Sequence, residues 1–375
     1  MKNRTVMLVA GEVSGDIHAA NLARTLAAIE PGIELFGVCG DRMTGAGVVA
    51  LASTSELAHM GLIEVVRELP RIRRLMQRLV ATADVRRPDL AVLVDSPDFN
   101  LRLARRLGKR GIPVVLYVSP QLWAWRKGRV RQVRRRAREV LCILPFEVDF
   151  YRQHGVAARY VGHPLVDDIE REGLRGGVEE RFPKRLALLP GSRAMEVGAL
   201  LPSMLETLSL IGRDLIDDVV LIEADGVGGA IDQVLAGGTA DSRLRRVTGE
   251  SRRKILAESA LALTASGTAT LECALLDVPM IVGYRLGRVS WALARMLVDV
   301  PHVALVNLIL GERAVPELLQ GNWDAPLLAA EVRRILAERG EGQYGALRRA
   351  RERLGPPGAS NAAAEAVLEH LNRSR

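Results

Sequence analysis

Short, continuous apolar runs alternate with helical stretches along the first half of the chain. Apolar runs of this length, bounded by polar turns, are typical of strands that are buried on both faces. Strands that alternate with helices predict a parallel sheet covered by helices on both sides. The predicted strands of this half are Val6–Ala10, Leu35–Val38, Leu90–Val94, Val114–Val118 and Val140–Leu144.

The same pattern starts again after a polar, glycine-rich stretch at residues 167–184. The length of 375 residues suits two domains of about 150 to 200 residues each. We therefore expect an α/β fold with domains at 1–170 and 171–345, and C-terminal helices at 346–375 that can cross back to the first domain. Two open parallel sheets facing a cleft would place ligands beyond the carboxyl ends of the strands. The second set of predicted strands comprises Leu186–Leu189, Val219–Glu223, Leu261–Ala265 and Met280–Tyr284.

The composition excludes several classes of protein. Hydrophobic residues make up 48% of the chain and charged residues 26%, which indicates a globular protein. No apolar stretch is long enough to span a bilayer, and the run after Met1 is too short for a signal peptide. The cysteines, Cys39, Cys142 and Cys273, lack the spacing of zinc sites or disulfides, so we expect a reducing compartment and no metal.

The net charge of +8 predicts an anionic partner: nucleic acid, an anionic membrane surface or a phosphorylated substrate. Eight of the thirteen residues at 126–138 are basic, while Val130 and Val133 lie on an apolar stripe. A second basic and apolar segment spans 59–79, where Pro70 is expected to divide two short helices. Such segments suit lipid headgroups or acyl chains, although a solvated face and core packing are ordinary alternatives. Nucleic acid is the weaker partner because only 4% of residues are aromatic.

The most informative turn joins the predicted strand Leu261–Ala265 to a helix through Ser266-Gly267-Thr268. Free amides and the positive end of the helix dipole would face an anion in this turn. We expect Glu272 in the first helical turn, where a carboxylate suits ribose hydroxyls better than a bare phosphate. The alternative is a simple N-cap formed by Ser266 or Thr268.

Three other strand ends carry candidate chemistry. The turn at residues 11–16 lacks the Gly-x-Gly-x-x-Gly spacing, so Glu12 and Ser14 suit sugar hydroxyls, with N-capping by Ser14 or Asp16 equally open. In Asp95-Ser96-Pro97-Asp98, Asp98 is the candidate general base and Asp95 the candidate cap. In Pro190-Gly191-Ser192-Arg193, the arginine can neutralise a diphosphate. Because the chain has no Asp-x-Asp sequence, a metal-independent transferase is the natural hypothesis.

Several short motifs follow one another in order along the chain. They are Gly11-Glu12-Val13-Ser14-Gly15-Asp16, Asp95-Ser96-Pro97-Asp98-Phe99-Asn100, Val118-Ser119-Pro120, Trp123-Ala124-Trp125-Arg126, Leu144-Pro145-Phe146-Glu147, Val161-Gly162-His163-Pro164, Leu189-Pro190-Gly191-Ser192-Arg193, Ser266-Gly267-Thr268-Ala269-Thr270-Leu271-Glu272 and Glu317-Leu318-Leu319-Gln320. Together they resemble the motifs of bacterial lipid-A-disaccharide synthases. The resemblance extends from residue 6 to about residue 320 and is far more specific than any single turn.

The resemblance implies a metal-independent, inverting glycosyltransferase with two Rossmann-like domains, of the GT-B type, that acts in lipid A biosynthesis. Such an enzyme joins UDP-2,3-diacylglucosamine to 2,3-diacylglucosamine 1-phosphate and releases UDP, with no cofactor. It would be cytoplasmic and peripheral to the inner membrane, with no nucleic-acid partner, and a homodimer is as open as a monomer.

Residue roles also follow from the resemblance. Asp98 would deprotonate the 6-hydroxyl of the acceptor, and Asn307 would contact the nucleotide although Val306 stands where the family usually has proline. The acceptor side would include Glu12, Ser14, Asp95, Trp125 and Arg126. The UDP side would include Gly191, Ser192, Arg193, Ser266, Gly267, Thr268, Thr270 and Glu272.

Two rivals have separate tests. A UDP-sugar epimerase of the same fold would act on UDP-N-acetylglucosamine alone, without a lipid acceptor. A nucleic-acid-binding protein would bind duplex DNA in a salt-dependent way and more tightly than acylated sugar phosphates.

Overall fold

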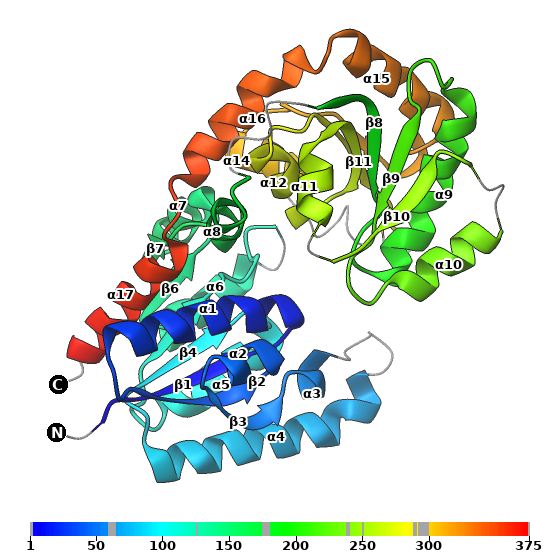
Figure 1. Ribbon diagram of the computed structural model, residues 1–375. Helices are drawn as coiled ribbons and strands as arrows, with labels where there is room; N and C mark the ends of the chain where they lie inside the picture. Colours follow the sequence, from blue (N-terminus) through cyan, green and yellow to red (C-terminus); the bar gives the residue numbers. More distant parts are fainter. Residues whose placement is uncertain are drawn as a thin grey trace. The chain divides into compact units, whose positions relative to one another are not determined.

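The computed structural model describes residues 3–58, 65–124, 127–174, 181–237, 241–249, 251–287, 291 and 300–373. The chain divides into two compact units, coloured mainly blue to cyan and green to orange in Figure 1. The first unit comprises Met1–Asp167 and Pro356–Arg375, and the second comprises Asp168–Gly355. The division therefore falls three residues before the expected position of 170, and the last twenty residues join the first unit.

The first unit is built on a seven-stranded parallel sheet with the order β3-β2-β1-β4-β5-β6-β7. Its central strands are wholly buried, as their continuous apolar sequences predict. Met7 and Val9 belong to a core cluster in which Leu79 and Leu103 are also buried. The strands are β1 (Thr5–Ala10), β2 (Glu34–Cys39), β3 (Val49–Ser53), β4 (Leu90–Val94), β5 (Val114–Tyr117), β6 (Glu139–Cys142) and β7 (Ala158–Tyr160).

Helices connect these strands, and the connection after β5 also contains a short 3-10 turn, Lys127–Arg129. The apolar stripe predicted on the basic segment is confirmed, because Val130 and Val133 of α6 are buried. The helices are α1 (Val13–Ile29), α2 (Asp41–Gly45), α3 (Ser55–Ala58), α4 (Val65–Arg86), α5 (Pro97–Gly108), α6 (Val130–Arg136) and α7 (Pro145–Gln153). The division between the units falls within the next helix, α8 (Pro164–Arg171).

The prediction that Pro70 divides two short helices is wrong, because α4 continues through it. Pro70 stands in the second turn, where the ring removes a single main-chain hydrogen bond near the helix start. Beyond it, Leu75, Met76 and Leu79 bury an apolar face against the core. That burial offsets the loss of the hydrogen bond and keeps the helix continuous.

The last helix, α17 (Ala359–Arg373), belongs to the first unit and lies beside α1 (Figure 1). Asp167 caps it, since its carboxylate accepts main-chain hydrogen bonds from Gly358 at 2.5 Å and Ala359 at 3.2 Å. Farther along, His370 Nε2 lies 2.9 Å from a carboxylate oxygen of Glu139 on β6. Polar contacts at both ends thus hold α17 on the first unit, although α17 is far from β6 in the sequence.

The second unit contains a six-stranded parallel sheet with the order β10-β9-β8-β11-β12-β13. Its strands are β8 (Phe182–Leu189), β9 (Asp218–Ile222), β10 (Leu244–Val247), β11 (Ser259–Ala265), β12 (Met280–Tyr284) and β13 (Glu317–Leu319). Its helices include α9 (Ala194–Leu210), α10 (Gly228–Ala236), α11 (Arg252–Ala257), α12 (Thr268–Leu275), α14 (Leu305–Leu310), α15 (Ala325–Ala337) and α16 (Glu341–Leu354), with a 3-10 turn at Gln320–Asn322. The predicted α/β class with two parallel sheets is therefore confirmed.

Among the helices that the structure describes, none combines the length and apolarity that a bilayer crossing requires.

Candidate active site

In the first unit, the turns after β1 and β4 pack directly on one another. A Cβ on Gly11 would fall 2.0 Å from the Cβ of Ser96, so only glycine permits this approach. Glu12 and Ser14 follow at the exposed start of α1. The contact brings these two predicted acceptor residues to the same sheet edge as Asp95 and its neighbours.

Asp16 has a structural role. Its carboxylate accepts main-chain hydrogen bonds from Gly40 at 2.7 Å, Arg42 at 3.0 Å and Met43 at 3.3 Å. It therefore caps α2, the helix after the neighbouring strand β2, and does not cap α1 as one of the two alternatives predicted.

The turn after β4 adopts an unusual backbone conformation. Asp95 and Ser96 have φ values of 54° and 41°, in the left-handed region that non-glycine residues rarely adopt. Asp95 Oδ1 accepts the Ser96 amide at 2.8 Å, so this side chain supports the turn as predicted. The side-chain Nδ2 of Asn100 donates to the main-chain carbonyls of Val94 at 3.0 Å and Asp95 at 2.7 Å. These bonds fix the direction in which α5 leaves the sheet.

Asp98, the predicted base, lies in the first turn of α5, and its side chain is 52% exposed. Its Oδ1 lies 2.5 Å from Nη1 of Arg129, in the 3-10 turn that precedes α6. Sequence reasoning assigned no role to Arg129, because it stood among eight basic residues in thirteen. The fold singles it out by bringing the connection after β5 against the start of α5.

A buried polar cluster supports the beginning of the same connection. Glu147 of α7 is wholly buried and accepts the indole Nε1 of Trp123 at 3.0 Å and the Leu144 amide at 3.2 Å. Burial raises the pKa of Glu147 to about 7, against the hydrogen bonds from Trp123 and the Leu144 amide that lower it. The Tyr151 hydroxyl donates to the Pro120 carbonyl at 2.6 Å. The connection is therefore anchored at its start by α7, and the buried Val130 and Val133 of α6 hold the chain just after Arg129.

Trp125 and Arg126, both predicted on the acceptor side, lie outside the described residues. Their flanks are described, with Trp123 packed edge-on against Phe146 at a ring separation of 4.9 Å. Arg129 follows on the other side at Asp98.

In the second unit, the turn after β8 is shaped by a residue that the sequence did not identify. Glu196 in α9 accepts the Ser192 amide at 3.0 Å and pairs with Nη1 of Arg193 at 3.0 Å. Gly191 has a φ of 119°, and a Cβ there would fall 2.4 Å from Glu196 Oε2. Arg193 remains 69% exposed, so its guanidinium is accessible to an anionic ligand.

The turn after β11 differs from the simple N-cap that was the alternative reading. The N-cap position is Gly267, with a φ of 134°, and its helix α12 has no side-chain cap there. The Ser266 hydroxyl instead donates to the Val303 carbonyl at 2.6 Å, and Thr268 is exposed. The Thr270 hydroxyl donates to the Gly267 carbonyl at 2.8 Å. Backbone amides at the start of α12 are therefore not capped by either predicted hydroxyl.

Glu272 does not lie in the first turn of α12, because the helix begins two residues earlier than expected, at Thr268. Its Oε1 accepts Nε of Arg253 at 2.9 Å. Burial lowers the pKa of Arg253, but Glu272, Glu172 and Asp168 outweigh burial and raise it. No sequence motif indicated Arg253, which stands nineteen residues before its partner.

Asn307 is wholly buried and its side chain is fully used within the unit. Its Nδ2 donates to the Val315 carbonyl at 3.0 Å and to Glu317 Oε1 at 2.8 Å. Its Oδ1 accepts the amides of Ala314 at 2.8 Å and Val315 at 2.9 Å. The structure therefore gives Asn307 a role inside the unit, and its contact with the nucleotide stays a prediction.

Strand register gathers the predicted UDP-side turns. β8 pairs with β11, and β11 pairs with β12, all in parallel, so their carboxyl ends share one edge. Tyr284, the last residue of β12, lies near Arg193 and Glu196; burial chiefly raises the pKa of its hydroxyl, and Glu196 adds to this. The turns at residues 191–193 and 266–268 consequently lie beside each other.

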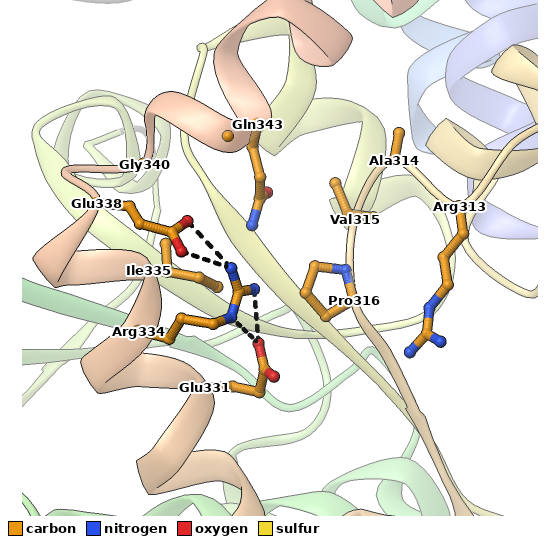
Figure 2. A pocket seen from close by; sticks show the side chains of 11 residues that line it. Arg313, Ala314, Val315, Pro316, Glu331, Arg334, Ile335, Glu338, Gly340 and Gln343 are labelled. Atoms are coloured by element: carbon orange, nitrogen blue, oxygen red, sulfur yellow. Dashed lines mark hydrogen bonds and ion pairs between the residues drawn. The ribbon is translucent and has the colours of Figure 1, made fainter.

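A surface pocket of about 350 Å³ lies elsewhere in the second unit. It is bounded by α15, α16 and the segment before β13, and Figure 2 shows Arg334 between Glu331 and Glu338 with Arg313 across the opening. None of the predicted site residues that the structure describes lines this pocket.

The sequence matches known proteins over almost its whole length. A family model described as "Lipid-A-disaccharide synthetase" matches residues 6–368. The chain is 42% identical to a lipid-A-disaccharide synthase of Myxococcus xanthus, over 99% of this chain and 98% of that protein. It is 44% identical to a lipid-A-disaccharide synthase of Anaeromyxobacter dehalogenans, over 97% of this chain and 96% of that protein.

Solved structures share the fold at low sequence identity. A UDP-GlcNAc 2-epimerase from Neisseria meningitidis, bound to UDP-GlcNAc, has a TM-score of 0.66 at 13% identity, covering 97% of this chain and 100% of that one. MurG from Acinetobacter baumannii has a TM-score of 0.60 at 12% identity, covering 98% and 100%. The two-unit architecture is that of GT-B glycosyltransferases.

Proposed function

The chain belongs to the lipid-A-disaccharide synthase family, and on this premise we propose a metal-independent, inverting transfer in which Asp98 is the base. The enzyme is a glycosyltransferase of lipid A biosynthesis. It condenses UDP-2,3-diacylglucosamine with 2,3-diacylglucosamine 1-phosphate to lipid A disaccharide 1-phosphate and UDP.

Asp98 would accept the proton of the acceptor 6-hydroxyl as its oxygen attacks the anomeric carbon of the donor sugar. The new C–O bond forms as the bond to the UDP oxygen breaks, and attack from the face opposite UDP inverts the anomeric configuration. The exposed position of Asp98 in the first turn of α5 carries this proposal, because the carboxylate can reach a substrate hydroxyl. Glu12 and Ser14, from the turn that packs on Ser96, would contact the same sugar.

UDP would be held by the turns after β8 and β11. Arg193 is exposed and can pair with the diphosphate, while the amides at the start of α12 can donate to phosphate oxygens. These groups would stabilise the charge that develops on the leaving UDP without a metal ion. Glu272, oriented by Arg253, would accept hydrogen bonds from the ribose hydroxyls.

We also propose that the enzyme works at the cytoplasmic face of the inner membrane, where its acylated substrates reside. Exposed arginines of α4 and α6, including Arg74, Arg131 and Arg135, would face anionic headgroups. Flotation with vesicles of anionic and of neutral lipid measures this binding, and equal recovery with both would refute the electrostatic part.

The test of the transfer is UDP release from the purified protein with both acylated sugars in excess EDTA. We expect full activity in EDTA and a loss of at least about 100-fold in kcat for Asp98→Asn, because a positioned base contributes on that order. Proton NMR of the product reports the anomeric configuration. UDP release that requires added metal, or an Asp98→Asn variant with near-normal turnover, would refute the mechanism.

A further inference from the structure

We propose that Arg129 binds the 1-phosphate of the acceptor sugar, and that this phosphate draws the guanidinium away from Oδ1 of Asp98, so that this oxygen can act as base. The inference rests on the proposed role of Asp98. It assigns Arg129 as a residue that determines specificity for a phosphorylated acceptor.

The geometry places the two groups in direct competition. Nη1 of Arg129 lies 2.5 Å from Oδ1 of Asp98, so the cation occupies a carboxylate oxygen that would receive the substrate proton. While this contact lasts, the guanidinium covers the side of Oδ1 that a substrate hydroxyl would approach. Proton transfer to Oδ1 therefore requires the guanidinium to move from this oxygen.

The acceptor carries the group that can make this change. A guanidinium forms strong, two-pronged hydrogen bonds with a phosphate, and a phosphate monoester carries more negative charge than a carboxylate. Arg129 is 29% exposed and Asp98 is 52% exposed, so a ligand can reach both side chains. The phosphate and the 6-hydroxyl belong to one sugar, which can occupy the two partners together.

Local structure keeps Arg129 available for the exchange. The connection that carries it is anchored through Trp123 to the buried Glu147 and through Pro120 to Tyr151. The start of α5 is fixed separately by Asn100. The two main chains can therefore stay in place while the Arg129 side chain changes partner.

The test compares the natural acceptor with 2,3-diacylglucosamine that lacks the phosphate, both carried in neutral detergent micelles. We expect the wild-type kcat/KM to favour the phosphorylated acceptor on the order of 100-fold, as for a charged hydrogen-bonded pair. In Arg129→Gln this preference should fall to within a few-fold of unity, and turnover of the acceptor without phosphate should be kept or raised. Arg129→Lys should retain part of the preference, because it keeps the charge without the fork.

Arg110→Gln is the matched control. Arg110 pairs with Asp84 at 2.6 Å, with side chains 34% and 50% exposed, in the same unit but at the far end of α5. This variant loses an equivalent surface ion pair and should keep the wild-type preference.

Three outcomes would overturn the proposal. Equal losses with both acceptors in Arg129→Gln would show a structural role, and an unchanged preference would show no role in phosphate binding. If Arg129→Gln loses the preference for the phosphorylated acceptor only when anionic phospholipid is added to the micelles, Arg129 acts at the membrane surface instead. If the wild type transfers no sugar to either acceptor, it is the proposed function that fails.

Discussion

Arg253 donates from Nε to Oε1 of Glu272 at 2.9 Å, and Glu172 and Asp168 face the same guanidinium. Both side chains of the central pair are only 15% exposed, so the pair holds a defined orientation at the second turn of α12. Because Arg253 retains two other carboxylates, removing Glu272 leaves no orphaned charge. The position therefore suits a functional test.

Glu272→Ala should raise the KM for the UDP-sugar by about 10-fold or more, because hydrogen bonds from the ribose lose a charged acceptor. The KM for the acylated acceptor should stay close to that of the wild type. Initial-rate kinetics with each substrate varied in turn separates the two constants. Glu331→Ala, which removes an exposed carboxylate paired with Arg334, is the control and should change neither KM. An unchanged donor KM in Glu272→Ala would remove the ribose assignment.

Asn307→Ala tests whether Asn307 acts on the fold or on the nucleotide. The wild-type side chain makes four hydrogen bonds inside the unit, two of which satisfy the amides of Ala314 and Val315. Truncation should lower the free energy of unfolding by about 2 to 5 kcal/mol, because buried partners lose their bonds. Thermal denaturation measures this loss, and isothermal titration with UDP well below the transition should show a Kd within a few-fold of the wild type. A large rise in the Kd for UDP with unchanged thermal stability would instead support the direct contact of Asn307 with the nucleotide.

The sequence predicted the central strands of both sheets but missed the outer ones. The missed strands are β3, β7, β10 and β13, which are the four sheet edges. An edge strand has one neighbour and less burial, so its sequence need not be continuously apolar. β10, for example, reads Leu-Arg-Arg-Val with two exposed arginines. The hydrophobic pattern therefore located the sheets without giving their width.

For the candidate site, the sequence predicted the turns at strand ends but not the pairings between distant segments. Asp98 and Arg193 could be chosen as candidate site residues because they follow buried strands, and the carboxyl ends of parallel strands meet at one edge of a sheet. Pairings between distant segments were not visible. Arg129 meets Asp98 across thirty-one residues and Asp16 meets Gly40 across twenty-four, and no short motif encodes either contact.

Glu147 connects the stability of the first unit to pH. Its pKa is raised from 4.5 to about 7, chiefly by burial. Between these two pH values, the folded state keeps the proton of Glu147 while the unfolded chain has released it. The contribution of Glu147 to stability is therefore greatest below pH 4.5 and declines as the pH rises to about 7. The pKa shift corresponds to a total decline of about 3 kcal/mol.

Glu147→Gln should remove this dependence, because the amide stays neutral at every pH. The amide oxygen can still accept the Trp123 indole, but the amide nitrogen faces the Leu144 amide, so we expect a loss of about 1 kcal/mol at pH 5. Between pH 5 and pH 8 the wild type should lose about 2 kcal/mol relative to the variant. Native-state hydrogen exchange of amides in β6 and α7 measures this in the first unit alone. The control is Glu312→Gln, at an exposed glutamate of the second unit, which should leave the exchange rates of the first unit unchanged. If the free energy of unfolding depends on pH equally in Glu147→Gln and in the wild type, Glu147 is ionised throughout this range.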